Sequence, residues 1–102
     1  MKRPKSKERR PHRVVMVAFE AAELLDVVGP LEVFANAAAL APEPRAYTVE
    51  IAAANIGPVR SASGLMLAAT GGYGAIAAAD TVLVAGGSGI EEAARDLALR
   101  DA

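Results

Sequence analysis

One carboxylate, Asp26, lies in an apolar segment between a predicted strand and a predicted helix, LLDVVGPLEVF over residues 24–34. A carboxylate among Leu and Val side chains would be partly desolvated, which favours its protonated form. A protonated acid of this kind can donate a proton to, or share one with, a nearby nucleophile or a bound water. Alternatively, Asp26 only caps the helix that follows, because Asp is among the preferred N-cap residues.

A second candidate site follows the apolar run at residues 81–85, where Gly86, Gly87 and Ser88 precede a helical pattern. Two adjacent glycines let backbone N–H groups approach a ligand closely, which suits an oxyanion hole or an anion-binding turn. The alternative is a tight strand-to-helix turn that binds nothing. A dinucleotide site is disfavoured, because Glu92 occupies the third glycine position of the G-x-G-x-x-G fingerprint.

The elements that must position these residues alternate along the chain. Apolar, β-branched runs predict strands at residues 13–19, 47–53 and 81–85. Pro30 suits the first turn of a helix that runs to about residue 40, before Pro42 and Pro44. Shorter signals predict a hairpin near residues 59–67, a turn at Gly57-Pro58, a loop at 70–74, a helical turn at 75–79 and a helix at 90–99.

This alternation predicts an α/β fold, a parallel sheet with flanking helices. Ligands of such sheets bind at the carboxyl ends of the strands. Asp26 follows the first predicted strand and Gly86-Gly87 follow the third. We therefore expect both candidate sites at the same edge of the sheet.

Composition limits the fold and the function further. The chain has 102 residues and is 53% hydrophobic, which is enough for one domain or less with a core of its own. Seven of its eleven basic residues fall within residues 1–13, so we predict a basic, disordered tail at 1–12 and a folded part at 13–102. The tail lacks interleaved aromatic residues and an apolar signal segment, which disfavours nucleic-acid binding and secretion.

Residue types exclude several chemistries within this chain. There is no Cys, and the one His is His12, so disulfides, a zinc site and a Ser-His-Asp triad are excluded. Ser61, Ser63 and Ser88 have no histidine base and make poor nucleophiles. No cofactor motif and no membrane-length apolar run is present, and we expect a cytoplasmic protein that needs no cofactor or metal.

Four segments taken together, RVVMVAF, LLDVVGPLEVF, GPVRSASGL and DTVLVAGGSGIEEA, resemble the ThiJ/PfpI superfamily, which has a glutamine-amidotransferase-like, flavodoxin-like fold. The most similar branch is the amidase-like N-terminal domain of GlxA-type regulators of the AraC family. Isonitrile hydratase-type enzymes share the LD-x-x-GP-x-EVF element. The resemblance covers residues 13–101.

The resemblance implies roles for individual positions. Asp26 matches the acidic residue beside the reactive Cys of enzymatic members. Gly86 and Gly87 match glycines whose backbone helps to form an anion pocket, and Gly29 and Pro30 match the turn that begins the first helix. Family domains continue with a strand and a nucleophile elbow that carries the Cys, so the resemblance implies that this chain is the N-terminal half of such a domain.

Three functions remain open at this point. The preferred one is a non-catalytic, ligand-sensing domain of a GlxA-like regulator, whose DNA contacts would come only from a missing C-terminal helix-turn-helix. The second is a fragment of an isonitrile hydratase-like or other ThiJ/PfpI hydratase or hydrolase. The third is a small α/β module that forms homo-oligomers to complete its sheet. The expected partners are a small-molecule ligand and other copies of the chain, not a membrane.

Overall fold

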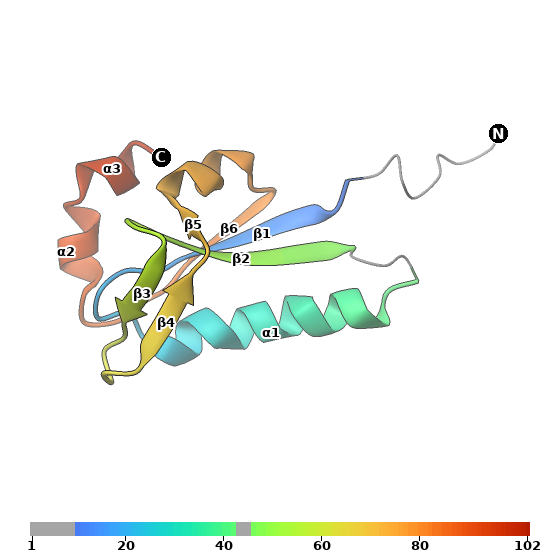
Figure 1. Cartoon of the computed structure of the whole chain (residues 1–102), viewed down its shortest axis with the longest axis horizontal. Helices are drawn as coiled ribbons and strands as arrows, with labels where there is room; N and C mark the ends of the chain where they lie inside the picture. The colour runs from blue at the N-terminus through green and yellow to red at the C-terminus, as the bar shows by residue number, and fades with distance from the viewer. Residues whose placement is uncertain (1–9, 43–45) are drawn as a thin grey trace.

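The computed structural model of the chain describes residues 10–42 and 46–102. Its main feature is a parallel sheet in the strand order β5-β2-β1-β6 (Figure 1). The strands are β1 (His12–Val17), β2 (Tyr47–Ala53), β5 (Gly71–Gly72) and β6 (Thr81–Val84). The predicted α/β class and the three main strands are confirmed.

Strand β1 lies inside the sheet because its side chains are apolar on both faces. Val14 to Val17 are each at most 1% exposed. Val14 and Met16 join the cluster that includes Val27 and Leu31 of helix α1 (Leu24–Leu40). A strand buried on both faces reads as a continuous apolar run, as this one does.

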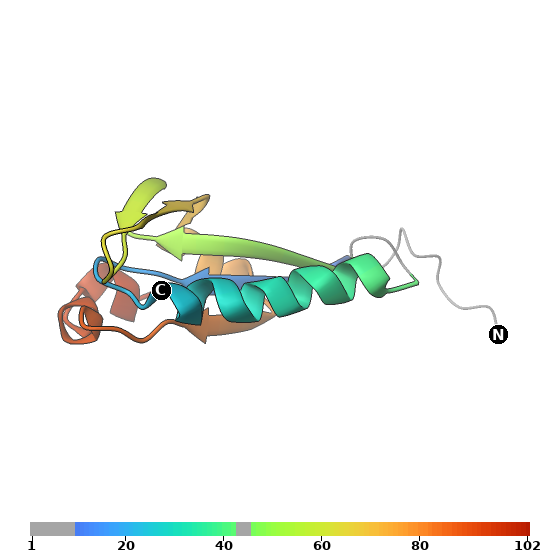
Figure 2. The same cartoon turned by 90° about the horizontal axis from the view of Figure 1, so that it is seen from below.

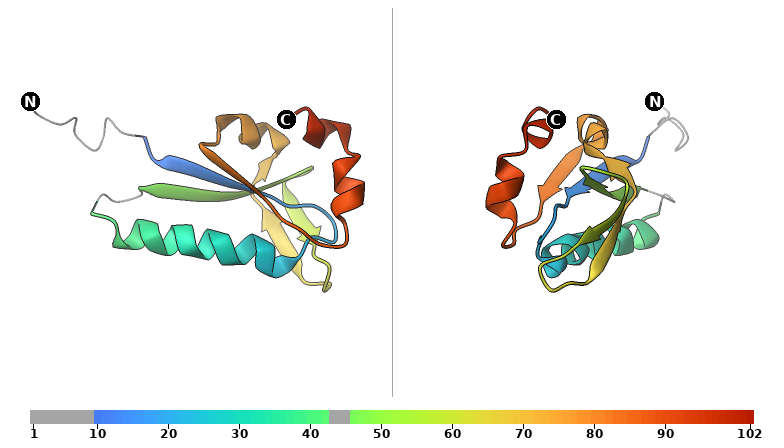
Figure 3. Two further views of the ribbon diagram at one scale, coloured as in Figure 1. Left: turned by 180° about the vertical axis from the view of Figure 1, so that it is seen from behind. Right: turned by 60° about the vertical axis from the view of Figure 1, so that its left-hand side comes forward.

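Helices cover the two faces of the sheet unequally. Helix α1 runs along one face, as Figure 2 shows from its side. The other face carries the 3-10 helix η2 (Tyr73–Ala78) and the short helices α2 (Ile90–Ala94) and α3 (Leu97–Arg100), visible in both views of Figure 3. No helix of the described residues is long and apolar enough to cross a membrane.

Helix α1 begins earlier than the sequence predicted. Its first residue is Leu24, so Gly29 and Pro30 lie inside the helix instead of in the turn that begins it. Proline inside a helix removes one backbone hydrogen bond. Burial of Val27 and Leu31, which are 0% and 8% exposed, offsets that loss by keeping one apolar stripe continuous against the sheet.

Three other boundaries differ from expectation. Gly71-Gly72, predicted as loop, pairs with Ala52 and Ala53 as strand β5. The hairpin of β3 (Gly57–Arg60) and β4 (Met66–Ala69) is confirmed, but the predicted turn at Gly57-Pro58 is the start of β3. The predicted helix at 90–99 divides into α2 and α3, because the Asp96 carboxylate accepts the Ala98 N–H at 2.9 Å and begins a new helix.

Part of the predicted basic tail, residues 1–9, lies outside the described residues, as does Pro44. Arg10 donates two hydrogen bonds of 2.7 Å to the Asp80 carboxylate, next to the start of β6. Together with the Arg13 backbone N–H, Arg10 holds the pKa of Asp80 well below its usual range. Arg10, which precedes β1, is therefore bound to Asp80, which precedes the neighbouring strand β6.

Candidate functional site

Two loops meet at the carboxyl edge of the sheet, residues 18–23 after β1 and residues 85–89 after β6. The Glu23 N–H donates to the Gly86 carbonyl at 2.8 Å, and the Gly89 N–H donates to the Ala21 carbonyl at 3.1 Å. These bonds hold the start of α1 against the start of α2. The sequence correctly predicted that the two segments lie together.

The glycines of the second loop are explained by this contact. Gly87 has φ +126°, and a Cβ there would lie 2.5 Å from the Glu23 nitrogen and 2.7 Å from the Ala21 oxygen. A Cβ at Gly89 would meet the Glu20 carbonyl oxygen. Both positions therefore need glycine so that two backbones can approach. The tight-turn interpretation accounts for them without a ligand.

Asp26 lies at this junction and contacts the glycine loop directly. Its Oδ2 accepts the Gly86 N–H at 3.0 Å. Asp26 is exposed, so the prediction that its apolar neighbours desolvate it is wrong. The reason is that Val27 turns into the core while Leu25 and Asp26 turn outward on the first helical turn.

The N-cap of α1 is Glu23, whose carboxylate faces the Leu25 N–H at 3.5 Å. The alternative interpretation of Asp26 as the cap is therefore also wrong. Asp26 lies in the first turn, where the helix dipole favours a negative charge. Its carboxylate accepts the Gly86 N–H and thereby joins the first turn of α1 to the glycine loop.

The loop after β1 carries backbone strain. Ala21 has φ +64°, which is uncommon for a residue with a side chain. Its N–H donates to the Arg60 carbonyl at 2.8 Å while its carbonyl accepts from Gly89, so hydrogen bonds on both sides fix this conformation. The Ala62 N–H adds a bond of 2.8 Å to the Ala22 carbonyl. The β3–β4 hairpin thus braces the same loop from the other side, and strain of this kind gathers at functional sites.

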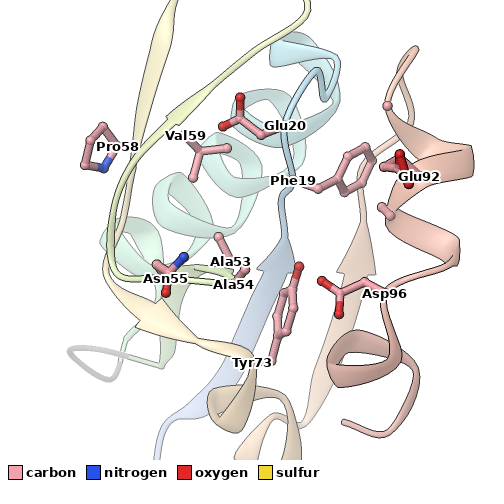
Figure 4. A pocket seen from close by; sticks show the side chains of 12 residues that line it. Phe19, Glu20, Ala53, Ala54, Asn55, Pro58, Val59, Tyr73, Glu92 and Asp96 are labelled. Carbon is pink, nitrogen blue, oxygen red and sulfur yellow. The ribbon is translucent and has the colours of Figure 1, made fainter.

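A pocket of about 250 Å³ opens beside this junction, above the ends of β1 and β2 (Figure 4). Its walls come from the loop after β1, the end of β2, strand β3, η2 and the last two helices. The lining residues are Phe19, Glu20, Ala53, Ala54, Asn55, Pro58, Val59, Tyr73, Gly89, Glu92, Ala93 and Asp96. A hollow at the carboxyl ends of parallel strands is where ligands of this fold class bind.

The pocket is lined by acidic and apolar residues. Glu20, Glu92 and Asp96 line it, and no Lys, Arg or His does. The Tyr73 side chain points toward Asp96 (Figure 4), and burial, followed by the Asp96 charge, raises the pKa of Tyr73. The tyrosine therefore keeps its proton and presents a hydroxyl donor to the pocket.

Glu20 has a structural role as well. Its Oε2 accepts the Arg60 N–H at 3.1 Å, which fixes the carboxylate against the β3–β4 hairpin. This bond joins the loop after β1 to strand β3, and both line the pocket. The arrangement gives the pocket a hydroxyl donor, an amide at Asn55 and three carboxylate acceptors.

None of the predicted site residues lines this pocket. Asp26 and Gly86 contact each other, but neither they nor Gly87 and Ser88 line the pocket, so their assigned role in binding a ligand stays a prediction. Sequence reasoning missed Tyr73, Glu92 and Asp96. The sequence around Tyr73 and in the helix after Gly89 contains no recognised binding motif. Only the packing of η2 and the last two helices on one face of the sheet brings these residues together.

Metal binding has no support among the described residues, which contain no group of three or more His, Asp or Glu side chains placed to hold an ion. The three acids of the pocket are thus too widely spaced to act as ligands of one cation. The expectation that no metal is needed stays a prediction.

Comparison with known proteins adds to this description. No family model matches the sequence. The chain is 40% identical over 80 residues to a Streptomyces lividans protein described as "Uncharacterized protein in cpoL 5'region", covering 78% of this chain and 55% of that protein. Among solved structures, a ThiJ/PfpI family protein from Pseudomonas syringae matches 88% of this chain with a TM-score of 0.74 at 23% identity.

The chain has the fold of a ThiJ/PfpI domain. An AraC-family transcriptional regulator from Pseudomonas putida matches 76% of this chain with a TM-score of 0.60 at 26% identity. These neighbours agree with the ThiJ/PfpI and AraC-regulator resemblance found in the sequence. The chain spans 35% of the Pseudomonas syringae chain and 48% of the Pseudomonas putida chain, and about half of the Streptomyces protein.

Proposed function

We propose that this chain forms part of a non-catalytic, ligand-sensing ThiJ/PfpI-like domain of a GlxA-like transcriptional regulator. The similarity to an AraC-family regulator, at 26% identity over 76% of the chain, supports the regulator branch. In this proposal, DNA is bound by a helix-turn-helix domain elsewhere in the parent protein. The chain contributes a surface that recognises a small molecule.

The observation that carries the sensing role is the pocket at the carboxyl edge of the sheet. It has a volume of about 250 Å³, room for a small metabolite. Its lining offers binding groups: the Tyr73 hydroxyl, the Asn55 amide and three carboxylates. Such groups can hold a small molecule by hydrogen bonds, as a sensor requires.

The charge of the lining defines the class of ligand. Glu20, Glu92 and Asp96 would repel a carboxylate or a phosphate, and the lining has no basic residue to offset them. A neutral amide or an aliphatic amine fits better, because it can donate hydrogen bonds to the carboxylates while its carbon atoms contact Phe19 and Val59.

Binding can be tested without knowing the natural ligand. We would measure thermal shifts of the chain with a panel of small aliphatic amines, amides and carboxylates. Ala54→Phe fills the pocket from an exposed position, and Ala39→Phe on the exposed side of α1 is the matched control. An amine or amide should stabilise the wild type and Ala39→Phe but not Ala54→Phe.

A response to carboxylates alone, or equal responses of both variants, would contradict the assigned pocket. The regulator branch is tested separately by the intact mass of the protein in its own cells, read with the coding sequence beyond residue 102. A product with a helix-turn-helix supports the regulator. A product with a nucleophile elbow and no helix-turn-helix contradicts it.

The second candidate function is part of an isonitrile hydratase-like or other ThiJ/PfpI hydratase or hydrolase. One observation favours it: the Asp26 carboxylate is held by the Gly86 N–H at 3.0 Å at the carboxyl edge and remains exposed. The resemblance implies that a reactive Cys would lie beside this acid. If so, a parent protein that carries the Cys should lose turnover when Asp26 is replaced by Ala.

A further inference from the structure

Asp96 belongs both to the pocket and to helix α3. It lines the pocket, where the side chain of Tyr73 points toward it (Figure 4). The Oδ1 atom of its carboxylate accepts the Ala98 N–H at 2.9 Å, which makes Asp96 the N-cap of α3. A carboxylate has two oxygens with about four acceptor positions. Asp96 can therefore cap the helix and accept a hydrogen bond from a ligand at the same time.

Helix α3 depends strongly on this cap because it is short and lies at the surface. It has four residues, and none of them is buried. Leu99 is partly buried against the core, whereas Leu97 is 67% exposed. A single helical turn is unstable alone, since several backbone angles must be fixed for each hydrogen bond gained. Loss of the Asp96 cap should therefore leave α3 largely unwound.

A second cavity, an apolar groove of about 330 Å³, adjoins α3 and β6. Phe19 and Ala93 line both the pocket and this groove, so the two cavities are neighbours. Helix α3 contributes to each of them, because its N-cap Asp96 lines the pocket and its Leu99 lines the groove. Unwinding of α3 would therefore move Leu99 and change the apolar surface of the groove.

We propose that a ligand in the pocket stabilises α3 through Asp96 and thereby fixes the apolar surface of the groove. This inference rests on the sensing function proposed above. In one state α3 is wound and Asp96 caps it; in the other α3 is unwound and the carboxylate is turned into solvent. A donor group of the ligand bonds to Asp96 only in the first state, because the cap bond holds the carboxylate at the pocket wall. A ligand shifts the population toward the state that it binds better.

The coupling is reciprocal, because a ligand that stabilises the cap is itself bound more tightly when the cap is formed, by the same factor. Glu92 provides the matched comparison. It lines the same pocket from α2, but its carboxylate lies 4.0 Å from Arg95 and is not the N-cap of any described helix. Loss of the Glu92 charge should therefore weaken the binding of an amine and leave the response of α3 at saturation unchanged.

The test is hydrogen exchange of the 102-residue chain, followed by NMR, with n-butylamine and propionamide as the probes. Binding is read from the ring signals of Tyr73. At saturation with a probe, the amides of Ala98 and Arg100 should exchange at least about fivefold more slowly, because they donate to the Asp96 carboxylate and the Asp96 carbonyl. The amide of Leu40, at the end of α1, is the internal reference and should not change.

Two variants show whether Asp96 carries the coupling. Asp96→Ala should abolish the protection of α3 by either probe, whereas Glu92→Gln should bind the amine more weakly and show full protection at saturation. A wild type that binds a probe without a change at Ala98 and Arg100 overturns the coupling and leaves the sensing function intact. Equal protection of α3 in Asp96→Ala overturns the coupling too. If neither probe binds, the ligand class assigned to the pocket and the coupling that rests on it are both wrong.

Discussion

Replacing Gly87 by Ala tests the contact that forms the carboxyl edge of the sheet. At φ +126° a residue with a side chain costs about 1–2 kcal/mol. The added Cβ would also lie 2.5 Å from the Glu23 nitrogen, 2.7 Å from the Ala21 oxygen and 2.9 Å from the Ala22 carbonyl carbon. All three are backbone atoms that cannot turn aside as a flexible side chain would, so overpacking adds about 1–3 kcal/mol.

The expected loss is about 2–5 kcal/mol of the free energy of unfolding, the sum of these two costs. Domains of this kind have about 5–15 kcal/mol in total, so the variant should be severely destabilised. The midpoint temperature should fall by about 10 °C or more. Urea and thermal unfolding, followed by far-ultraviolet circular dichroism, measure both quantities.

Gly74→Ala is the matched control, because it adds the same methyl group with nothing within 4 Å. Gly74 is exposed in η2, so the substitution should change the free energy of unfolding by only about 0.5 kcal/mol. If Gly87→Ala unfolds with the same free energy as the wild type, the close approach of the two loops is wrong. If Gly74→Ala loses as much stability as Gly87→Ala, the loss does not come from the loop contact.

Substitutions at three acidic residues test the charged groups. Asp26→Ala should cost about 0.5–1.5 kcal/mol by removing the acceptor of Gly86, whereas Asp26→Asn should retain most of that stability; urea unfolding compares them. Asp80→Asn should lower stability at neutral pH, and its difference from the wild type should begin to shrink only below about pH 4 and vanish at still lower pH, as the pH falls through the depressed folded-state pKa of Asp80; unfolding at several pH values tests the sign. Asp96→Ala should cost about 0.5–2 kcal/mol as a lost N-cap and should lower the pKa of Tyr73 in an ultraviolet titration; an unchanged tyrosine titration would contradict their proximity.

The fold class was predictable because local patterns and topology agree. The short, β-branched runs of β1, β2 and β6 favour strands, and the intervening helical spacing predicts a crossover between parallel strands. The end of α1 before Pro42 followed from the proline alone. The start of α1 did not, because burial of Val27 and Leu31 against the sheet outweighs the cost of Pro30, and that burial is a tertiary effect.

The candidate site was predictable only in part. The sequence by itself determined that Asp26 and the glycine loop would meet, since the carboxyl ends of parallel strands share one edge of a sheet. Only the tertiary structure decided that Gly87 and Gly89 serve backbone contact and that Asp26 is exposed. It also decided that Glu20, Tyr73 and Asp96 line one pocket. These residues are far apart in sequence, and the packing of η2 and α3 on one face of the sheet is what brings their side chains together.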